Sequence, residues 1–148
     1  MGQSGHPLVG QTLPPLSVAD WFPSEIALQN LAGKIVVIDF WATWCAPCLG
    51  AIPKNNGLAQ KYHSRGVEFV GICATTGAER MAEVARERRI EYPIAKDVAK
   101  ATERALQVRF FPSYFVVDRH GVVRAAGLTP SKVEPAVCEV LAEQPAAG

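Results

Sequence analysis

Two cysteines separated by two residues are the part of the chain that most clearly predicts chemistry. Cys45 and Cys48 stand in the segment DFWATWCAPCLGAIP, which starts in a predicted strand and continues into a predicted helix. Side chains three positions apart lie on the same face of a helix, so the two sulfur atoms are within bonding reach. The spacing therefore predicts a disulfide that is readily exchanged rather than a structural cross-link.

The position of Cys45 predicts a lowered pKa for its thiol. The residue falls where the strand ends and the helix begins, so its sulfur faces the unpaired backbone N–H groups of the first turn and the positive end of the helix dipole. The pKa of an ordinary cysteine is about 8.5, and that of a CxxC cysteine at a helix N-terminus falls to roughly 3.5–7.5. We expect Cys45 to be the nucleophile and Cys48 the resolving thiol. Pro47 suits the first turn, where a missing N–H is no loss.

The composition limits the classes of function that the chain supports. Its 148 residues are 49% hydrophobic and carry a net charge of +1, which predicts one domain over residues 1–148 and argues against binding to nucleic acid. The chain lacks an apolar run of membrane-spanning length, and its first ten residues lack the pattern of a signal peptide. We expect a soluble, monomeric protein. The compartment stays open at this point, because a signal or anchor can precede the sequence given.

Hydrophobic periodicity predicts that strands and helices alternate along the chain. Apolar β-branched runs predict buried strands over residues 35–41 and 67–73, and a hairpin of two further strands around Gly121. Helical patterns cover four segments, residues 46–65, 78–89, 98–107 and 131–143. These elements predict an α/β architecture with a mixed sheet covered by helices on both faces.

The segment WATWCAPC resembles the active-site segment of the thioredoxin superfamily, and most closely that of the TlpA/ResA-type extracytoplasmic thiol-disulfide oxidoreductases. The run GKIVVIDFWATWCAPC is similar to the first strand and motif, Pro53 to the proline that kinks the active-site helix, and FPSYFVVDRHG to the cis-proline and closing hairpin. The resemblance covers nearly all of the chain. It implies a thioredoxin-like fold with a central mixed β-sheet, an N-terminal arm over residues 1–30 and a helical insertion over about residues 75–96.

The resemblance also assigns residues around the cysteines. Pro112 takes the place of the cis-proline that faces the two thiols, whereas the residues alone leave open a trans proline in a strand-entry turn. A cis bond turns the chain so that the backbone of residue 111 can pair with an extended substrate strand. The residues expected to contact the substrate are Trp44, Ala46, Pro47 and Phe111.

Asp39 is an acid inside the apolar run VVIDFW. A buried ionised carboxylate is costly, so this side chain must lie at a strand edge, find a partner or keep its proton. Its place, six residues before Cys45, matches the buried acid of thioredoxin, and we expect it to accept the Cys48 proton; a structural acid is the alternative. The TlpA/ResA branch commonly has Asn here and Glu three residues after the second cysteine, where this chain has Ala51. Proton transfer in this chain is therefore expected to follow thioredoxin.

The other two cysteines are interpreted as small core residues, and a bridge between Cys73 and Cys138 is a minor alternative. The three histidines share no metal-ligand spacing, so the sequence predicts no metal site. We expect no cofactor other than the redox-active disulfide formed by Cys45 and Cys48.

The function that these features favour is dithiol-disulfide exchange with protein substrates through a mixed disulfide. A peroxiredoxin-type thiol peroxidase and a metal-binding chaperone that uses the CxxC pair are the alternatives. The resemblance implies a reductant in the bacterial periplasm or envelope, recharged by a membrane electron carrier and serving cytochrome c maturation or another envelope protein. A cytoplasmic location is the alternative, and Ala46 and Pro47 do not decide the direction of electron flow.

Overall fold

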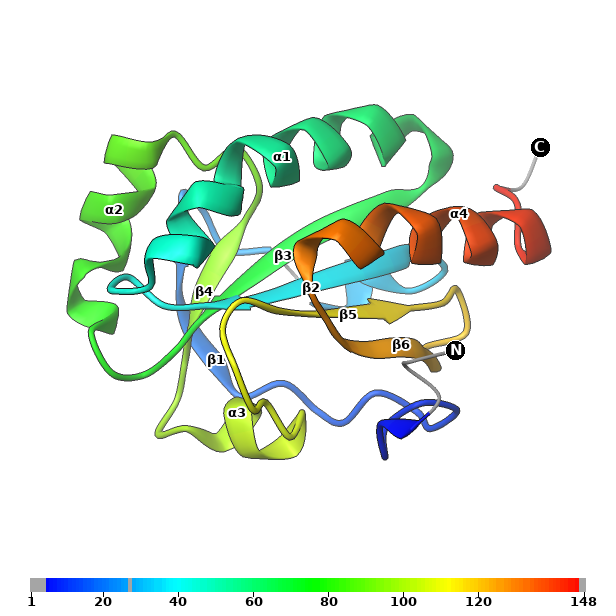
Figure 1. The fold of residues 1–148 in the computed structure, drawn as a ribbon, viewed down its shortest axis with the longest axis horizontal. Coiled ribbons are helices and arrows are strands. Elements are labelled where there is room, and N and C mark those ends of the chain that lie inside the picture. Colours follow the sequence, from blue (N-terminus) through cyan, green and yellow to red (C-terminus); the bar gives the residue numbers. More distant parts are fainter. Residues whose placement is uncertain (1–4, 27, 147–148) are drawn as a thin grey trace.

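A six-stranded sheet forms the centre of the molecule (Figure 1). The computed structural model describes residues 5–26 and 28–146, so residues 1–4, 27 and 147–148 of the predicted arm and domain lie outside the described part. The strands are β1 (Val18–Phe22), β2 (Ile35–Trp41), β3 (Val67–Cys73), β4 (Ile94–Asp97), β5 (Ser113–Val117) and β6 (Val123–Leu128), in the order β1-β4-β3-β2-β5-β6. Strands β2, β3 and β4 are parallel to one another and the others antiparallel to their neighbours, so the predicted mixed sheet is confirmed.

Helices cover both faces of this sheet. They are α1 (Ala46–Tyr62), α2 (Met81–Arg88), α3 (Ala101–Ala105) and α4 (Val133–Glu143). Helices α1 and α4 lie side by side on one face, where Lys61 and Tyr62 of α1 both donate hydrogen bonds to Glu134 of α4. Helix α3 lies on the other face together with the N-terminal arm (Figure 1). Among the residues described, no helix is both long and apolar enough to cross a bilayer.

The central strands are buried along almost their whole length. Every residue of β2 and β5 is buried, and so is every residue of β3 except one. This is the pattern expected for strands with helices packed on both faces. The apolar side of α4 that the periodicity predicts faces the sheet, with Val133, Val137, Val140 and Leu141 buried. The core therefore fixes the end of β2, from which the two cysteines follow.

Three elements differ from the sequence prediction, and the first is β1, a strand within the segment predicted as an arm. Strand β4 is short and follows a loop, so its four residues give no clear period, yet they pair with β3 on one side and β1 on the other. The helix predicted over residues 98–107 is only Ala101–Ala105, because Ala99 and Lys100 have positive φ angles of 51° and 63°. The carboxylate of Asp97 then accepts the N–H of Thr102 at 2.7 Å, which caps the start of the shortened helix.

The N-terminal arm follows both edges of the sheet. The N–H of Gly10 donates to the carbonyl of Val123 at 2.8 Å, and the N–H of Leu13 donates to that of Gly121 at 2.9 Å, beside β6. The arm then crosses to the opposite edge, where residues 18–22 form β1 against β4. An open sheet edge offers unpaired backbone groups to other chains, and the arm covers part of the β6 edge, whereas at the opposite edge its β1 is the outermost strand.

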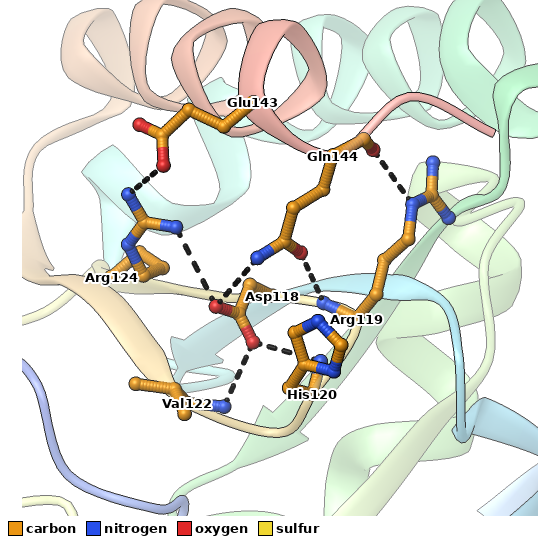
Figure 2. Close-up of polar contacts among 7 residues, drawn as sticks. All are labelled: Asp118, Arg119, His120, Val122, Arg124, Glu143 and Gln144. Carbon is orange, nitrogen blue, oxygen red and sulfur yellow. Dashed lines mark hydrogen bonds and ion pairs between the residues drawn. The ribbon is translucent and has the colours of Figure 1, made fainter.

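The hairpin between β5 and β6 is fastened to the end of α4 (Figure 2). Asp118 accepts hydrogen bonds from the backbone N–H groups of His120 at 2.9 Å and Val122 at 3.0 Å, and from Gln144 Nε2 at 3.1 Å. Burial alone raises the pKa of Asp118, but these hydrogen bonds and one from Arg124 outweigh it and hold the pKa below its ordinary value. The carboxylate is therefore a stable, ionised anchor for the turn.

Arg119 joins this hairpin to the loops at the same end of the sheet. Its guanidinium donates to the carbonyl of Gln144 at 2.8 Å, and also to the carbonyls of Gly33 at 3.1 Å, Arg65 at 3.0 Å and Gly66 at 3.3 Å. Gly33 and Gly66 precede β2 and β3, so one side chain connects the starts of the two central strands with α4. This connection holds the end of the sheet that lies away from Cys45.

We predict that Arg119→Ala lowers the free energy of unfolding by about 2 kcal/mol, because four backbone carbonyls from three segments lose hydrogen bonds to one charged donor. Urea unfolding of the oxidised protein measures the loss. Arg109→Ala is the control, since Arg109 is exposed and takes no part in the hydrogen bonds that hold this end of the sheet. Equal losses in the two variants would contradict the anchoring role of Arg119.

Candidate active site

Cys45 is the N-cap of helix α1. Its backbone is extended, with φ −97° and ψ 105°, and its Sγ accepts a hydrogen bond from the N–H of Cys48 at 3.2 Å. The chain turns here because β2 stays buried up to Trp41 and Pro47 then occupies the first turn of the helix, where no N–H is needed. The first-turn sequence APCL contains no acid. The positive end of the helix dipole therefore acts on the sulfur without an opposing local charge.

The two cysteines form a disulfide, and their Cα atoms are 5.2 Å apart. Both are shielded in this oxidised state, with exposed fractions of 6% for Cys45 and 2% for Cys48. The three residues beside them, Trp44, Ala46 and Pro47, are exposed. A partner protein therefore meets these neighbours first, before it reaches the sulfur of Cys45.

Aromatic side chains hold the surface next to the disulfide. Trp44 is 58% exposed, and its ring meets the ring of Phe111 edge-on with the centroids 5.6 Å apart. Phe111 in turn stacks on the buried Phe40, at 5.9 Å. The indole N–H of Trp44 donates to the carbonyl of Thr76 at 3.1 Å. An exposed tryptophan is thus fixed from two sides, which makes it a preformed contact surface.

The peptide bond between Phe111 and Pro112 is cis, as the resemblance implies. Ser113 pairs with Phe40 in antiparallel register, so Pro112 lies level with Trp41, where β2 ends and the turn to Cys45 begins. A second cis bond joins Phe22, the last residue of β1, to Pro23, and no sequence feature predicts it. The structure thus brings the predicted proline to the same end of the sheet as the two cysteines.

Asp39 is buried in the middle of β2, with an exposed fraction of 2%. Desolvation raises the pKa of its carboxyl to about 7, against an opposing hydrogen bond from Tyr92. Its Oδ2 accepts hydrogen bonds from Asn55 Nδ2 at 3.2 Å and from the Tyr92 hydroxyl at 3.4 Å. Its Oδ1 has no partner among the residues described. A carboxyl with a pKa near neutrality is well suited to take up and release a proton.

Sequence reasoning missed three residues that surround Asp39. Asn55 comes from α1, Tyr92 precedes β4 and Tyr114 lies in β5, and all three are buried. The Tyr114 hydroxyl donates to Asn55 Oδ1 at 3.0 Å, and Asn55 Nδ2 donates to the Tyr92 hydroxyl at 3.2 Å. The signal that was available is Asn55 itself, a polar residue on the otherwise apolar buried side of α1, seven positions after Cys48.

The remaining cysteines are both free thiols, so the alternative of a bridge between them is wrong. Cys73 is a core residue as predicted, and burial raises the pKa of its thiol to about 12. The prediction was wrong for Cys138, which is exposed, because it lies about 100° around α4 from the buried Val137. Within residues 5–26 and 28–146 no three His, Cys, Asp or Glu side chains lie close enough together to hold a metal ion.

Comparison with known proteins agrees with this geometry. Residues 8–141 match the Redoxin family. Over 115 residues the chain is 30% identical to thiol-disulfide oxidoreductase ResA of Bacillus cereus, a match that covers 78% of this chain and 66% of that protein. The chain thus spans slightly less than two thirds of the length of that relative.

Two solved structures resemble nine tenths of the chain. One, from Chlorobium tepidum, is described as a thiol:disulfide interchange protein DsbE; it has a TM-score of 0.80 and 25% identity, and the match covers 90% of this chain and 97% of that one. The other is a thioredoxin-like protein in its oxidised form, with a TM-score of 0.78, 29% identity and coverage of 90% and 97%. The chain belongs to the Redoxin family and has a thioredoxin-like fold. Within that fold it resembles ResA-type proteins.

We predict that Gly77→Ala displaces Trp44. A Cβ at position 77 would lie 2.8 Å from Thr43 Oγ1 and 2.9 Å from Trp44 Cδ1, and the φ angle of +83° disfavours any side chain. The clash should weaken the hydrogen bond from Trp44 to Thr76 and cost about 1–3 kcal/mol beyond the backbone strain. The indole N–H resonance of Trp44 and urea unfolding measure the two effects.

Gly121→Ala is the matched control for this substitution. Gly121 has nearly the same φ angle, +80°, but a Cβ there meets no atom within 4 Å. It therefore carries the backbone strain without the clash. If both variants lose the same stability and leave the indole resonance unchanged, Gly77 has no role in placing Trp44.

We predict that Asp39→Asn makes the oxidised protein relatively more stable as the pH rises. Between pH 3.8 and about 7 the folded chain keeps the Asp39 proton that the unfolded chain has released, so the wild-type free energy of unfolding falls across this window. Asparagine does not titrate. Relative to the variant, the wild type should lose roughly 3–4 kcal/mol between pH 4 and pH 8. Urea unfolding at several pH values tests this, and a constant difference would contradict the raised pKa of Asp39.

Proposed function

We propose that this protein is a thiol-disulfide oxidoreductase that exchanges its Cys45–Cys48 pair with cysteine pairs of protein substrates. The observation that carries the proposal is the hydrogen bond from the Cys48 N–H to Cys45 Sγ at the start of α1. Partial positive charge at that sulfur favours the thiolate, the form of cysteine that attacks disulfides. The matched ResA protein is itself named as a thiol-disulfide oxidoreductase.

The reaction in the reducing direction has two steps. The Cys45 thiolate attacks one sulfur of the substrate disulfide, which forms a mixed disulfide and releases the other substrate sulfur as a thiolate. Cys48 then loses its proton and attacks Cys45 Sγ, so the mixed disulfide breaks and the Cys45–Cys48 bond forms. The substrate gains two electrons, the enzyme pair loses two, and the released substrate sulfurs take up protons from solvent.

Asp39 is the proton acceptor for the second step in this proposal. Cys48 is only 2% exposed, so water alone is a poor acceptor for its proton. The pKa of about 7 lets Asp39 be ionised in a good part of the molecules at neutral pH and still bind a proton when Cys48 releases one. Burial is the cause of that pKa, and Oδ1, which has no partner in the described part of the chain, is available to receive the proton.

The surface around Cys45 supports a polypeptide substrate. Within the described part of the chain, the large hydrophobic side chains that are clearly exposed are Trp44, Val98 and Phe110. All three lie at the same end of the sheet as Cys45. Trp44 and Val98 follow the parallel strands β2 and β4, and Phe110 precedes the antiparallel β5. We propose that this end of the sheet binds an extended substrate segment through Trp44, Ala46, Pro47, Phe111 and the backbone beside Pro112.

The biological setting is proposed from the resemblance to the TlpA/ResA branch. The protein acts as a monomeric, single-domain reductant outside the cytoplasm, with residues 75–96 as the family-type insertion. An upstream redox partner, such as a membrane electron carrier, returns two electrons to the Cys45–Cys48 disulfide. The substrates are protein disulfides, in cytochrome c maturation or elsewhere in the envelope, and the disulfide is the only redox group required.

The test combines an activity with a trapping experiment. The wild type should accelerate the reduction of insulin by dithiothreitol. In Cys45→Ser and in Cys48→Ser the rate increase over dithiothreitol alone should be more than about tenfold smaller. Incubated with an oxidised protein substrate, Cys48→Ser should accumulate mixed disulfides through Cys45, whereas Cys45→Ser should not.

Three results would count against the proposal. Mixed disulfides that accumulate in Cys45→Ser instead would reverse the roles of the two thiols. A wild type that fails to accelerate insulin reduction but retains zinc or copper through dialysis would favour metal binding. Rapid turnover of hydrogen peroxide without insulin reduction would favour a thiol peroxidase.

A further inference from the structure

A buried amide lies at the centre of the polar side chains around Asp39. Asn55 is 2% exposed, and each of its polar atoms has a partner. Its Nδ2 donates to Asp39 Oδ2 and to the Tyr92 hydroxyl, both at 3.2 Å, and its Oδ1 accepts from the Tyr114 hydroxyl at 3.0 Å. The Tyr92 hydroxyl then donates to the same Asp39 oxygen at 3.4 Å. The donors and acceptors in this cluster match, and a single oxygen, Asp39 Oδ1, is left over.

The amide also links Asp39 to the helix that carries the reacting thiols. The buried side of α1 consists of Cys48, Ala51, Ile52, Asn55, Leu58 and Tyr62. Cys48 and Asn55 are seven residues apart, so they project from the same side of the helix, two turns from each other. The side chain that holds Asp39 therefore belongs to the same helix as the thiol whose proton Asp39 is to accept.

We propose that Asn55 is a positioning residue: it binds Oδ2 of Asp39, together with Tyr92, and thereby leaves Oδ1 as the atom that accepts the proton of Cys48. This inference rests on the proton-acceptor role of Asp39 in the proposed function. In the resolving step the S–H bond of Cys48 breaks, an O–H bond forms at Oδ1, and the sulfur attacks Cys45 as the substrate thiolate leaves. The proton on Oδ1 afterwards passes to solvent.

An asparagine suits this position because it is neutral and has two donor hydrogens. Two donated hydrogen bonds to Oδ2, from Asn55 and Tyr92, favour the ionised carboxylate and counteract desolvation. A leucine of similar size would leave Asp39 with Tyr92 alone and would also orphan the Tyr114 hydroxyl. The ionised form would then be harder to reach, and proton transfer would require a higher pH.

The other titratable groups near Asp39 remain uncharged at neutral pH. Burial raises the pKa of Tyr92 well above its ordinary value and also raises that of Tyr114, which faces Asp39 from β5. Cys73 in the neighbouring β3 has its pKa raised to about 12, again by burial. The helix contributes the neutral Asn55 and the reacting Cys48. A change in the pH profile therefore reports on Asp39 and on the thiols themselves.

The experiment follows one turnover of the reduced protein with one equivalent of Ellman's reagent, in a Cys138→Ser background that removes the exposed thiol. Cys45 releases the first thionitrobenzoate, and Cys48 releases the second when it resolves the mixed disulfide. Stopped-flow absorbance gives both rates as a function of pH. In the wild type the second rate should rise with pH through the titration of Asp39, whereas the first follows the thiol of Cys45.

The expected result concerns the second rate alone. Asn55→Leu should move the midpoint of its pH profile up by about one unit and slow it about tenfold at pH 6, because one hydrogen bond to the carboxylate is lost. The first rate should change less than about twofold, since Cys45 does not contact Asn55. Tyr92→Phe removes the other donor to Oδ2 and should shift the midpoint in the same direction.

Asn56→Leu is the matched control for the helix. The neighbouring Asn56 is only partly buried, donates to the carbonyl of Arg89 at 2.9 Å and accepts the N–H of Glu91 at 2.9 Å, so it serves the loop after α2 instead of Asp39. Its substitution should lower stability and leave the pH midpoint of the second rate unchanged. A general loosening of α1 would instead move the profile in both asparagine variants.

The outcomes separate this inference from the proposed function. An unchanged midpoint in a folded Asn55→Leu overturns the role of Asn55; if that variant does not fold, an unchanged midpoint in Tyr92→Phe overturns it. If Asp39→Asn abolishes the pH dependence while Asn55→Leu leaves it intact, Asp39 keeps its role and Asn55 loses it. If Asp39→Asn has no effect on the second rate, both fail. If Cys45 releases no thionitrobenzoate, the proposed function itself fails.

Discussion

The hydrogen bond from the Cys48 N–H to Cys45 Sγ is the contact on which the rest of the site depends. It exists because α1 begins immediately after Cys45, and α1 begins there because β2 is buried along its whole length and delivers the chain to one edge of the sheet. Glu134 of α4 accepts hydrogen bonds from the far end of α1, so the helix is held at both ends. The core thus aims the helix dipole at one sulfur atom.

Burial and the helix dipole bring the pKa values of two different groups toward about 7, one from below and one from above. The dipole lowers the pKa of a thiol that ordinarily titrates near about 8.5. Desolvation raises the pKa of Asp39 from 3.8 to about 7. The lowered pKa serves the first step, in which the Cys45 thiolate attacks, and the raised pKa of Asp39 serves the second step, in which Asp39 takes the proton of Cys48, so one fold performs both steps near neutral pH. The hydrogen bonds from Asn55 and Tyr92 limit how far burial raises the pKa of Asp39.

The sequence predicts those parts of the site whose signal is local. The spacing of Cys45 and Cys48, the buried runs of β2 and β3, and the apolar side of α4 can all be read from neighbouring residues. The cluster around Asn55 cannot, because its partners are 16, 37 and 59 positions away along the chain. Strand β4 was not predicted for a similar reason. Its four residues are recognisable as a strand only through their pairing with β1 and β3 on either side. The exposure of Cys138 depends on the exact rotation of α4, which a periodic pattern does not fix.

The most direct test of this account is the pH dependence of the alkylation of Cys45 by iodoacetamide in the reduced Cys138→Ser protein. The rate follows the thiolate fraction, so its midpoint gives the pKa of the Cys45 thiol. We expect a midpoint below about 7.5, within the range of CxxC cysteines at helix N-termini. A midpoint at about 8.5 or higher, as for an ordinary cysteine, would contradict the claim that α1 stabilises the Cys45 thiolate.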